Sequence, residues 1–364
     1  GGVAERWRSE RWDSLHLLTP NWMTRLPGWC YTGPDPDGYM SASELVRHLE
    51  RYAASFHAPI VPDTNVLEIS ATRSPGCARF CVVTDSGTWH ARHVVVATGP
   101  HGRPHLPGGL SGISSRVEVL TASSYRNPDT FPPGGVLVVG ASASGVQIAD
   151  ELSSTGREVA IAVGRHTRMP RRYRGMDSFW WLEATGRLAR TIDQVPDIAA
   201  ARRENSLQLI GRAEVHLRGS DLDLQTLQDR GVRLLGRLEG VVGTEASFRD
   251  DLSERVAEAD RRMHHVLDTV DDYIDRVGLN RELLPALRPR SVDMPGPVTR
   301  LNLASENIRT VVVAAGYRPD HRWLRVPVLE QDGSIRQHRG VTPAPGFYVV
   351  GQYFQHRRDS GFID

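Results

Sequence analysis

Apolar residues follow two different periods along this chain, and one segment contains both. Residues 136–139 are continuously apolar, a turn of small residues follows at 140–145, and the apolar spacing in 146–152 is that of an amphipathic helix. A second apolar run fills most of 158–163. A strand, a helix and a strand in this order form a βαβ unit, whose strands pair in parallel through a right-handed crossover. The pattern therefore predicts an α/β fold.

Other segments carry equally clear patterns. Residues 41–56 have apolar positions at helical spacing behind a Ser-x-x-Glu capping box. Residues 79–84 and 88–97 alternate and then become continuously apolar, as expected of a hairpin that leads into a buried strand. Residues 176–290 are mostly helical by pattern, which predicts a largely helical insertion in the α/β fold.

Within that insertion, one long helix is predicted at 249–278. Its apolar residues recur every three or four positions and form a narrow seam on one side. They are Leu252, Val256, Ala259, Met263, Val266, Val270, Ile274 and Val277. Two interpretations stay open: the seam packs against its own domain, or it forms the contact of a homodimer.

The chain repeats one local form, an apolar strand that ends in a glycine. "HVVVATGP" at 93–100 is echoed by "VVVAAGYRPD" at 311–320, and "FYVVGQYF" at 347–354 ends in the same way. Two Gly/Pro-rich stretches, at 99–109 and 132–135, lie between the first of these strands and the βαβ unit. This echo is the chain's only internal repeat.

The composition of the chain excludes several classes of function and points directly to none. The 364-residue chain is long enough for two domains and has a net charge of +1, which gives no sign of a nucleic-acid partner. No apolar run approaches the ~20 residues of a membrane span, and there is no signal peptide. The three cysteines, Cys30, Cys77 and Cys81, form no CxxC pair. We therefore expect a reduced, cytoplasmic protein.

Several reaction classes lack the residues that they need. The chain contains no lysine, which excludes Schiff-base chemistry and a P-loop. It also contains no GxSxG or HExxH pattern and no other metal-ligand spacing. Neither a hydrolase nor a metal site is predicted.

The turn inside the βαβ unit, "VLVVGASASGVQIADEL" at 136–152, has the form of a dinucleotide-binding turn. In such turns the first glycine allows the bend, the second lets the backbone approach the pyrophosphate, and the third lets the helix pack closely. Amide groups at the helix start then bind the phosphates. The candidate cofactor-binding residues here are Gly140, Ser142, Ser144 and Gly145. Ser142 replaces the middle glycine, so its hydroxyl either donates to a phosphate or lowers the affinity.

The end of the second strand predicts which dinucleotide binds. An acidic residue there would bind the ribose hydroxyls of NAD. This chain has Arg165 and Arg168 and no carboxylate, and a guanidinium pairs well with a 2′-phosphate. We therefore predict NADPH as the nucleotide, with a solvated basic loop as the alternative interpretation.

The order of these parts resembles that of the flavin-containing monooxygenases and their relatives, including the plant indole-3-pyruvate monooxygenases. The resemblance covers 1–175 and 308–364 and rests on motifs such as "VVVATGPHGRPHLP", "VLVVGASASGVQIADEL", "GRHTRMPRR" and "VVVAAGYRPD". It implies two nested Rossmann-like domains. An FAD-binding domain would comprise 1–101 and 316–364, and an NADPH-binding domain would comprise 102–315 with the helical insertion at about 176–290.

The resemblance also implies which residues lie near the flavin. Thr98 and Gly99 would lie at the first crossing between the domains, and Gly316 at the second. The other positions implied are Trp7, Thr19, Asn21, Gly351 and Gln352. Trp7 could equally be a core residue, and Thr19 and Asn21 could be turn residues.

Two departures from the family pattern stand out. Nothing before residue 30 offers the glycine-rich turn that would bind FAD. Either about 40 residues, the size of a βαβ unit, precede Gly1 in a longer protein, or this chain binds no FAD by itself. In addition, Ser115, Val117 and Thr121 stand where the family fingerprint has Phe, Gly and His. The second departure weakens the specific prediction of monooxygenation.

The implied enzyme is an NADPH- and FAD-dependent monooxygenase. NADPH would reduce the flavin, and the reduced flavin would bind O₂ as a C4a-(hydro)peroxide that oxygenates a small organic substrate. The sequence assigns no catalytic acid or base. A non-catalytic NADPH-binding or regulatory module is the alternative, and the missing CxxC pair argues against a disulfide reductase.

Overall fold

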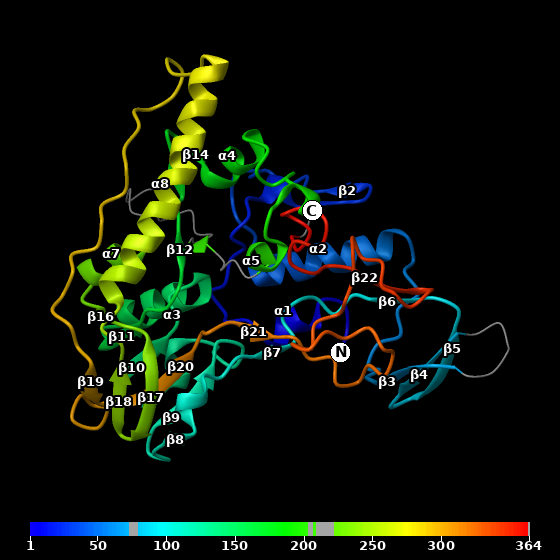
Figure 1. Ribbon diagram of the computed structural model, residues 1–364, viewed down its shortest axis with the longest axis horizontal. Coiled ribbons are helices and arrows are strands. Elements are labelled where there is room, and N and C mark those ends of the chain that lie inside the picture. Colours follow the sequence, from blue (N-terminus) through cyan, green and yellow to red (C-terminus); the bar gives the residue numbers. More distant parts are fainter. Residues whose placement is uncertain (73–78, 203–206, 209–221, 363–364) are drawn as a thin grey trace.

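A five-stranded parallel sheet forms the core of one part of the computed structural model, which describes residues 1–72, 79–202, 207–208 and 222–362 (Figure 1). Its strands do not follow the order of the sequence, because each neighbouring pair is joined by a crossover. From one edge to the other they are β16 (Arg233–Leu235), β11 (Val159–Ala162), β10 (Gly135–Val139), β20 (Ile308–Val313) and β9 (Glu118–Thr121). The predicted α/β fold is confirmed at this level.

Alternate residues of the central strand face two different layers. Val136 and Val138 of β10 pack against α3 (Ala143–Ser154) and α7 (Leu224–Asp229). Leu137 and Val139 face the opposite side, where a four-stranded sheet covers them. That second sheet has the order β19 (Arg300–Asn302), β18 (Glu245–Phe248), β17 (Leu238–Gly243) and β8 (Gly112–Ile113). Because both faces are covered, β10 and β11 are buried along their whole length, which explains their continuously apolar sequences.

The insertion at 176–290 is only partly helical. It contains α4 (Ser178–Ala184), α5 (Ile198–Arg202), α7 and α8 (Leu252–Val277), but also the strands β16, β17 and β18. The prediction of a largely helical insertion is therefore wrong for 233–248. The strands of this stretch have three to six residues, too few for a period of two to be distinguished from helical spacing in the sequence.

The long predicted helix exists, and its apolar seam is used inside the chain. Met263, Leu267, Val270 and Ile274 of α8 pack on a cluster that includes Trp181 of α4. This confirms that most of the seam packs within the chain. Val277, at the end of the seam, is exposed, and a dimer contact through this helix stays a prediction.

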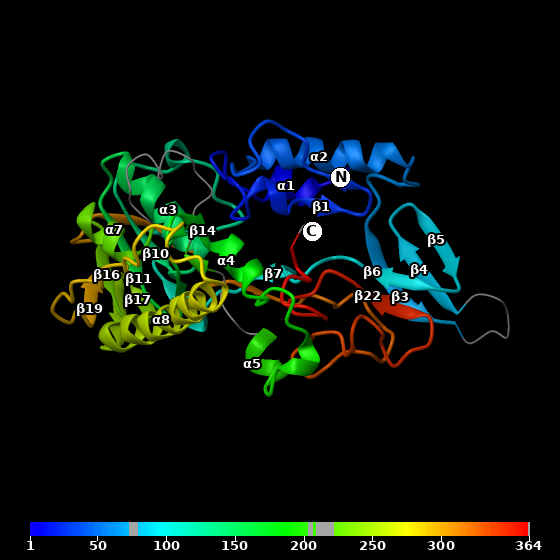
Figure 2. The same cartoon turned by 90° about the horizontal axis from the view of Figure 1, so that it is seen from above.

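The remaining part of the chain lies beside the parallel sheet (Figures 1 and 2). Here α1 (Glu5–Ser9) lies along α2 (Ala42–Ser55), which begins with the predicted capping box at Ser41. The predicted hairpin is present as β4 (Phe80–Thr84) and β5 (Gly87–Ala91), paired with β3 (Val66–Ala71). It leads into β6 (Val94–Val96), which pairs in parallel with β22 (Phe347–Val349).

Two extended segments connect these parts, β7 (Arg103–Pro104) and β21 (Tyr317–Arg318), which pair with each other. The other short strands are β1 (Arg25–Leu26), β2 (Trp29–Cys30), β12 (Thr167–Arg168), β13 (Arg172–Tyr173), β14 (Met176–Asp177) and β15 (Leu207–Gln208). Single 3₁₀ turns occur at Asn21–Met23, Gly108–Leu110, Pro128–Thr130 and Ile192–Gln194. Among the described residues, no helix is long and apolar enough to cross a membrane.

Candidate functional site

The turn between β10 and α3 depends on two glycines. Gly140 has a φ of +113°, and a Cβ at this position would lie 2.4 Å from the carbonyl oxygen of Ala314, at the end of β20. A Cβ on Gly145 would lie 1.8 Å from the carbonyl oxygen of Gly140. The first glycine therefore lets the turn pass close to the neighbouring strand, and the second lets the helix pack onto the turn.

Ser142 is the N-cap residue of α3. Its backbone is extended, with φ −84° and ψ −173°, and its side chain makes no capping hydrogen bond. Serine is often preferred at an N-cap because its hydroxyl accepts a backbone hydrogen bond, but Ser142 makes no such bond, so capping does not explain why serine replaces glycine here. Ser142 and Ser144 are both half-buried, so they border the helix N-terminus without being enclosed.

The first turn of α3 is suited to an anion. Its leading amides have no carbonyl partner within the helix, and the helix dipole adds positive charge at this end. The turn contains no acidic residue that would compete for these amides. A phosphate group could therefore bind here through backbone N–H groups.

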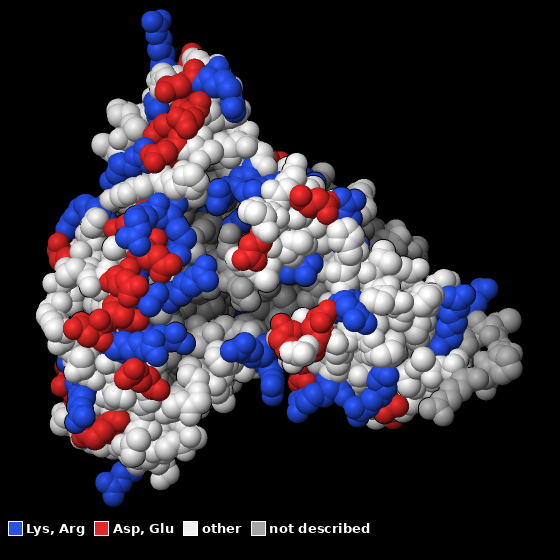
Figure 3. All heavy atoms as spheres, in the orientation of Figure 1, with Lys and Arg blue, Asp and Glu red and all other residues white. Residues whose placement is uncertain are grey.

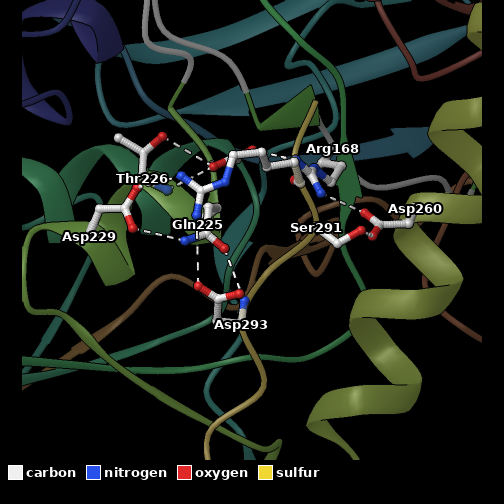
Figure 4. A network of polar contacts seen from close by, with 9 residues as sticks. Arg168, Gln225, Thr226, Asp229, Asp260, Ser291 and Asp293 are labelled. Atoms are coloured by element: carbon white, nitrogen blue, oxygen red, sulfur yellow. Dashed lines mark hydrogen bonds and ion pairs between the residues drawn. The ribbon is translucent and has the colours of Figure 1, made fainter. Parts of the chain in front are cut away.

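The two arginines predicted to select NADPH lie in different surroundings. Arg165 follows β11 at the carboxyl edge of the sheet and is exposed. Arg168 is only 3% exposed and donates hydrogen bonds to Asp223 and Asp260, at 2.6 and 2.7 Å (Figure 4). A third bond, of 2.7 Å, goes to the carbonyl oxygen of Arg290. These contacts favour a structural role for Arg168 over the predicted contact with a 2′-phosphate, because its guanidinium balances two largely buried carboxylates.

The network around Arg168 fixes the surroundings of the nucleotide turn. Asp223 caps α7 and Asp260 lies on α8, so one side chain of β12 joins both helices. In Figure 4 the network continues through Gln225, whose amide nitrogen donates to Asp229 and whose oxygen accepts from the backbone of Asp293. Arg168 is thus a positioning residue for the chain segment that follows Arg165.

The three predicted glycine-containing strand ends come together in the structure. Gln352 Nε2 donates to the carbonyl oxygen of Gly99 at 3.2 Å, which links the end of β22 to the end of β6. Gly99, Gly316 and Gly351 all have positive φ, and a Cβ added to any of them would meet no atom within 4 Å. Thr98 and Gly316 are exposed. Open space therefore lies beside each of these turns.

His101 joins the three strand ends, and the sequence analysis did not identify it. Its ring lies 4.8 Å from the ring of Tyr317 in an edge-on arrangement, and its Nε2 lies 2.6 Å from the hydroxyl of Tyr353. Arg6 donates to the carbonyl oxygen of His101. The signal in the sequence was the repeated strand-glycine form itself, since His101, Tyr317 and Tyr353 each follow one of its glycines by one or two positions.

Burial keeps both members of this pair neutral, and nearby cations add to the effect at His101. Burial, together with the charges of Arg11 and Arg6, lowers the pKa of His101 to about 4. Burial raises the pKa of Tyr353 to about 12, although 47% of its side chain is exposed in total. At neutral pH the imidazole and the phenol therefore share a hydrogen bond between uncharged groups.

The N-terminal candidates have mainly structural contacts. Asn21 is 4% exposed; its Nδ2 donates to the carbonyl oxygen of Asp35 and its Oδ1 accepts from the backbone N–H of Met40. These bonds match the interpretation of Asn21 as a turn residue. Trp7 packs against the core with the Arg11 guanidinium 5.0 Å from its ring centre, and Thr19 is half-buried.

The surface between the two parts of the molecule is hollowed. Figure 3 shows a recess between the parallel-sheet part and the part that carries β3–β5, with arginine side chains on its rim. No group of three or more potential metal ligands occurs among the described residues. Cys30 and Cys81 are free thiols, and Cys77 lies outside the described residues. Arginine and acidic side chains both lie at the rim of the recess (Figure 3).

Solved structures with a similar fold include enzymes of two kinds. A flavin-containing monooxygenase from Stenotrophomonas maltophilia aligns with a TM-score of 0.59 at 18% identity, over 95% of this chain and 79% of that one. The bacillithiol disulfide reductase of Staphylococcus aureus aligns with a TM-score of 0.55 at 11% identity, over 100% of this chain and 84% of that one. At these identities the likeness shows a shared α/β flavoprotein fold.

Comparison of the sequence with known proteins identifies a narrower group of relatives than the fold does. The sequence model of the pyridine nucleotide-disulphide oxidoreductases matches residues 31–206. The CzcO-like oxidoreductase of Geobacillus kaustophilus is 30% identical over 363 residues, which cover 99% of this chain and 84% of that protein. The predicted resemblance to this group of flavoproteins is confirmed, and the chain belongs to the CzcO-like oxidoreductases.

Proposed function

We propose that this oxidoreductase is a flavin monooxygenase that uses NADPH, FAD and O₂ to oxygenate a small organic substrate. The observation that carries the proposal is the turn between β10 and α3. Both of its glycines are required by close backbone contacts, and an exposed arginine follows the next strand. The overall reaction converts NADPH, a proton, O₂ and the substrate into NADP⁺, water and the oxygenated substrate.

The residues at the turn fit NADPH. The pyrophosphate would bind the first amides of α3, with Ser142 and Ser144 bordering it, and Arg165 would pair with the 2′-phosphate. No carboxylate follows β11 to repel that phosphate. When bound, NADPH supplies the hydride, and the chain's own residues hold and orient it.

The three joined strand ends fit FAD. The open space beside Gly99, Gly316 and Gly351 gives room for a flat ring system, and Thr98 and Gln352 supply polar groups next to it. Trp7 and Thr19 belong to the same proposal, whereas Asn21 would act only by shaping the turn. When bound, FAD supplies the two-electron redox centre. The proposed domains are 1–101 with 316–364 for FAD, and 102–315 for NADPH.

A disulfide reductase is the competing member of the same family. Such an enzyme needs two cysteines that can form a reversible disulfide at the flavin. Cys77 and Cys81 are four positions apart in the sequence, and Cys30 and Cys81 are on separate strands, β2 and β4. This spacing supports oxygen as the final acceptor.

The direct test is to purify the chain and follow both cofactors. A bound flavin would absorb at about 450 nm, and anaerobic addition of NADPH would bleach that band more effectively than NADH. Readmission of O₂ should restore the colour. A colourless chain that still binds NADPH would instead favour a non-catalytic NADPH-binding module. Rapid turnover with a disulfide, and none with O₂, would contradict the monooxygenase proposal.

A further inference from the structure

Gln208 lies against the nucleotide turn, and the sequence analysis did not identify it. It belongs to β15, which pairs in parallel with β12, so that Gln208 is opposite Arg168. Its side chain is completely buried, and its Nε2 donates to the carbonyl oxygen of Ala141 at 2.5 Å. Ala141 lies between Gly140 and the N-cap Ser142. The amide of Gln208 is therefore fixed directly at the turn.

The other half of this amide has no partner. Gln208 Oε1 is buried and accepts no hydrogen bond from the described part of the chain. A buried acceptor left unpaired destabilises the folded state, and such groups are rare in folded proteins. Because Nε2 is held by Ala141, the amide cannot rotate to exchange the two atoms without losing that bond. The orphaned oxygen thus stays beside the N-terminus of α3.

The chemistry of the orphaned atom limits what it can bind. A carbonyl oxygen accepts hydrogen bonds and repels phosphate oxygens, so it is not part of the phosphate site itself. The groups next to the pyrophosphate of a dinucleotide are the two riboses, whose hydroxyls are donors. A hydroxyl would complete the pairing of Gln208 Oε1 while the helix amides bind the phosphates.

We infer that Gln208 is a nucleotide-binding residue whose side-chain oxygen accepts a hydrogen bond from a ribose hydroxyl of the bound dinucleotide. The inference rests on the proposed binding of NADPH at the turn. The residue that would bind the ribose hydroxyl lies 67 positions beyond Ala141 in the sequence. Residue 208 would then distinguish a dinucleotide from a free phosphate, which has no ribose.

Gln208→Met tests the inference, because methionine keeps the length of the side chain and removes both polar atoms. NADPH affinity would be measured by fluorescence titration, alongside the melting temperature without ligand. Losing the hydrogen bond to the ribose should raise the Kd about three- to tenfold, and losing the bond from Nε2 to Ala141 should appear as a lower melting temperature without ligand. Gln208→Glu should raise it further, because a carboxylate would repel the pyrophosphate. This second variant also serves if Gln208→Met does not fold.

Thr310→Val is the matched control. Thr310 is 1% exposed on β20, and its hydroxyl is also buried without a partner, but it lies within the sheet. Its replacement removes the same kind of orphaned atom and should leave the NADPH affinity unchanged. If both variants weaken binding equally, the effect of Gln208 is general destabilisation and the inference is overturned.

Adenosine 2′,5′-bisphosphate distinguishes the two riboses, because it contains only the adenosine ribose. If Gln208→Met weakens this ligand as much as NADPH, the oxygen binds the adenosine ribose. If only NADPH is weakened, it binds the nicotinamide ribose. If Gln208→Met binds both ligands as tightly as the wild type does, the inference is overturned and the proposed function stands. A wild-type chain that binds neither ligand would overturn the proposed function, and the inference with it.

Discussion

The hydroxyl of Tyr353 lies 2.6 Å from Nε2 of His101, although 252 positions separate the two residues in the sequence. The bond joins the segment after β22 to the segment after β6. Edge-on contact with Tyr317 adds the segment after β20. One imidazole therefore holds together the three strand ends at which we place the flavin.

Replacing His101 should change how stability depends on pH. The pKa of His101 is lowered from 6.5 to about 4 in the folded protein, mainly by burial. The unfolded chain therefore takes up the proton first as the pH falls. The stabilisation is complete above about pH 6.5 and is lost progressively towards about pH 4. His101→Phe keeps an aromatic ring and removes the titration. Its melting temperature should fall less between these pH values than that of the wild type, and parallel curves would contradict this explanation.

Arg168 should prove to be a stability residue. Its guanidinium is 3% exposed and bonded to Asp223 and Asp260, so Arg168→Met leaves two largely buried carboxylates unpaired. Removal of one partner from a buried ion pair costs about 3–5 kcal/mol. Urea unfolding of the variant should show a loss of this order. If the variant unfolds like the wild type but discriminates poorly between NADPH and NADH, Arg168 contacts the nucleotide after all.

Arg165→Ala should weaken the binding of NADPH and leave the stability of the fold nearly unchanged. Arg165 is exposed at the end of β11, so its loss should change the free energy of unfolding by no more than about 0.5 kcal/mol. A charge-assisted bond at such a site contributes on the order of 1 kcal/mol, so the Kd for NADPH should rise about fivefold. NADH binding, measured in the same titration, should be unaffected. Arg309→Ala, an exposed arginine near the start of β20, is the control and should change neither Kd.

The two arginines show how far the sequence could predict the site. The βαβ unit and its glycine turn follow from local patterns, because the apolar periods and the need for glycine are set by residues within one short segment. The burial of Arg168 is not local. It depends on Asp223 and Asp260, which are 55 and 92 positions away and belong to two helices. Arg165 and Arg168 are equivalent in the sequence and differ only through this packing.

The same argument explains the misjudged stretch at 233–248. Its residues form β16 at the edge of the parallel sheet and β17 and β18 in the sheet that covers one of its faces, with Leu235 and Phe248 in a single cluster. Intrinsic β propensity is weak compared with such packing. The contact of Gln208 with Ala141 could not be predicted for a related reason, because no local sequence pattern links two residues that lie 67 positions apart.

Ser142→Gly tests the least expected residue of the turn. Ser142 makes no capping bond, so its removal should cost at most a few tenths of a kcal/mol of stability. If the side chain only narrows the approach of the pyrophosphate, the NADPH affinity of Ser142→Gly should be equal to or higher than that of the wild type. A large loss of affinity would show instead that the hydroxyl donates to a phosphate oxygen. Calorimetric titration of both proteins with NADPH separates the two outcomes.

Gly140→Ala should damage the turn for two reasons that a control can separate. The φ of +113° is unfavourable for any residue with a Cβ, and here that Cβ would lie 2.4 Å from the carbonyl oxygen of Ala314. Gly156, which follows α3, has a φ of +80°, but a Cβ there would meet nothing within 4 Å. Gly156→Ala should therefore cost only the backbone strain, about 1–2 kcal/mol. Gly140→Ala should cost more and also lose NADPH binding, because β10 and β20 must separate to admit the methyl group. Equal destabilisation of both variants, with NADPH affinity retained in each, would mean that the close approach of the turn to Ala314 is not needed for the site.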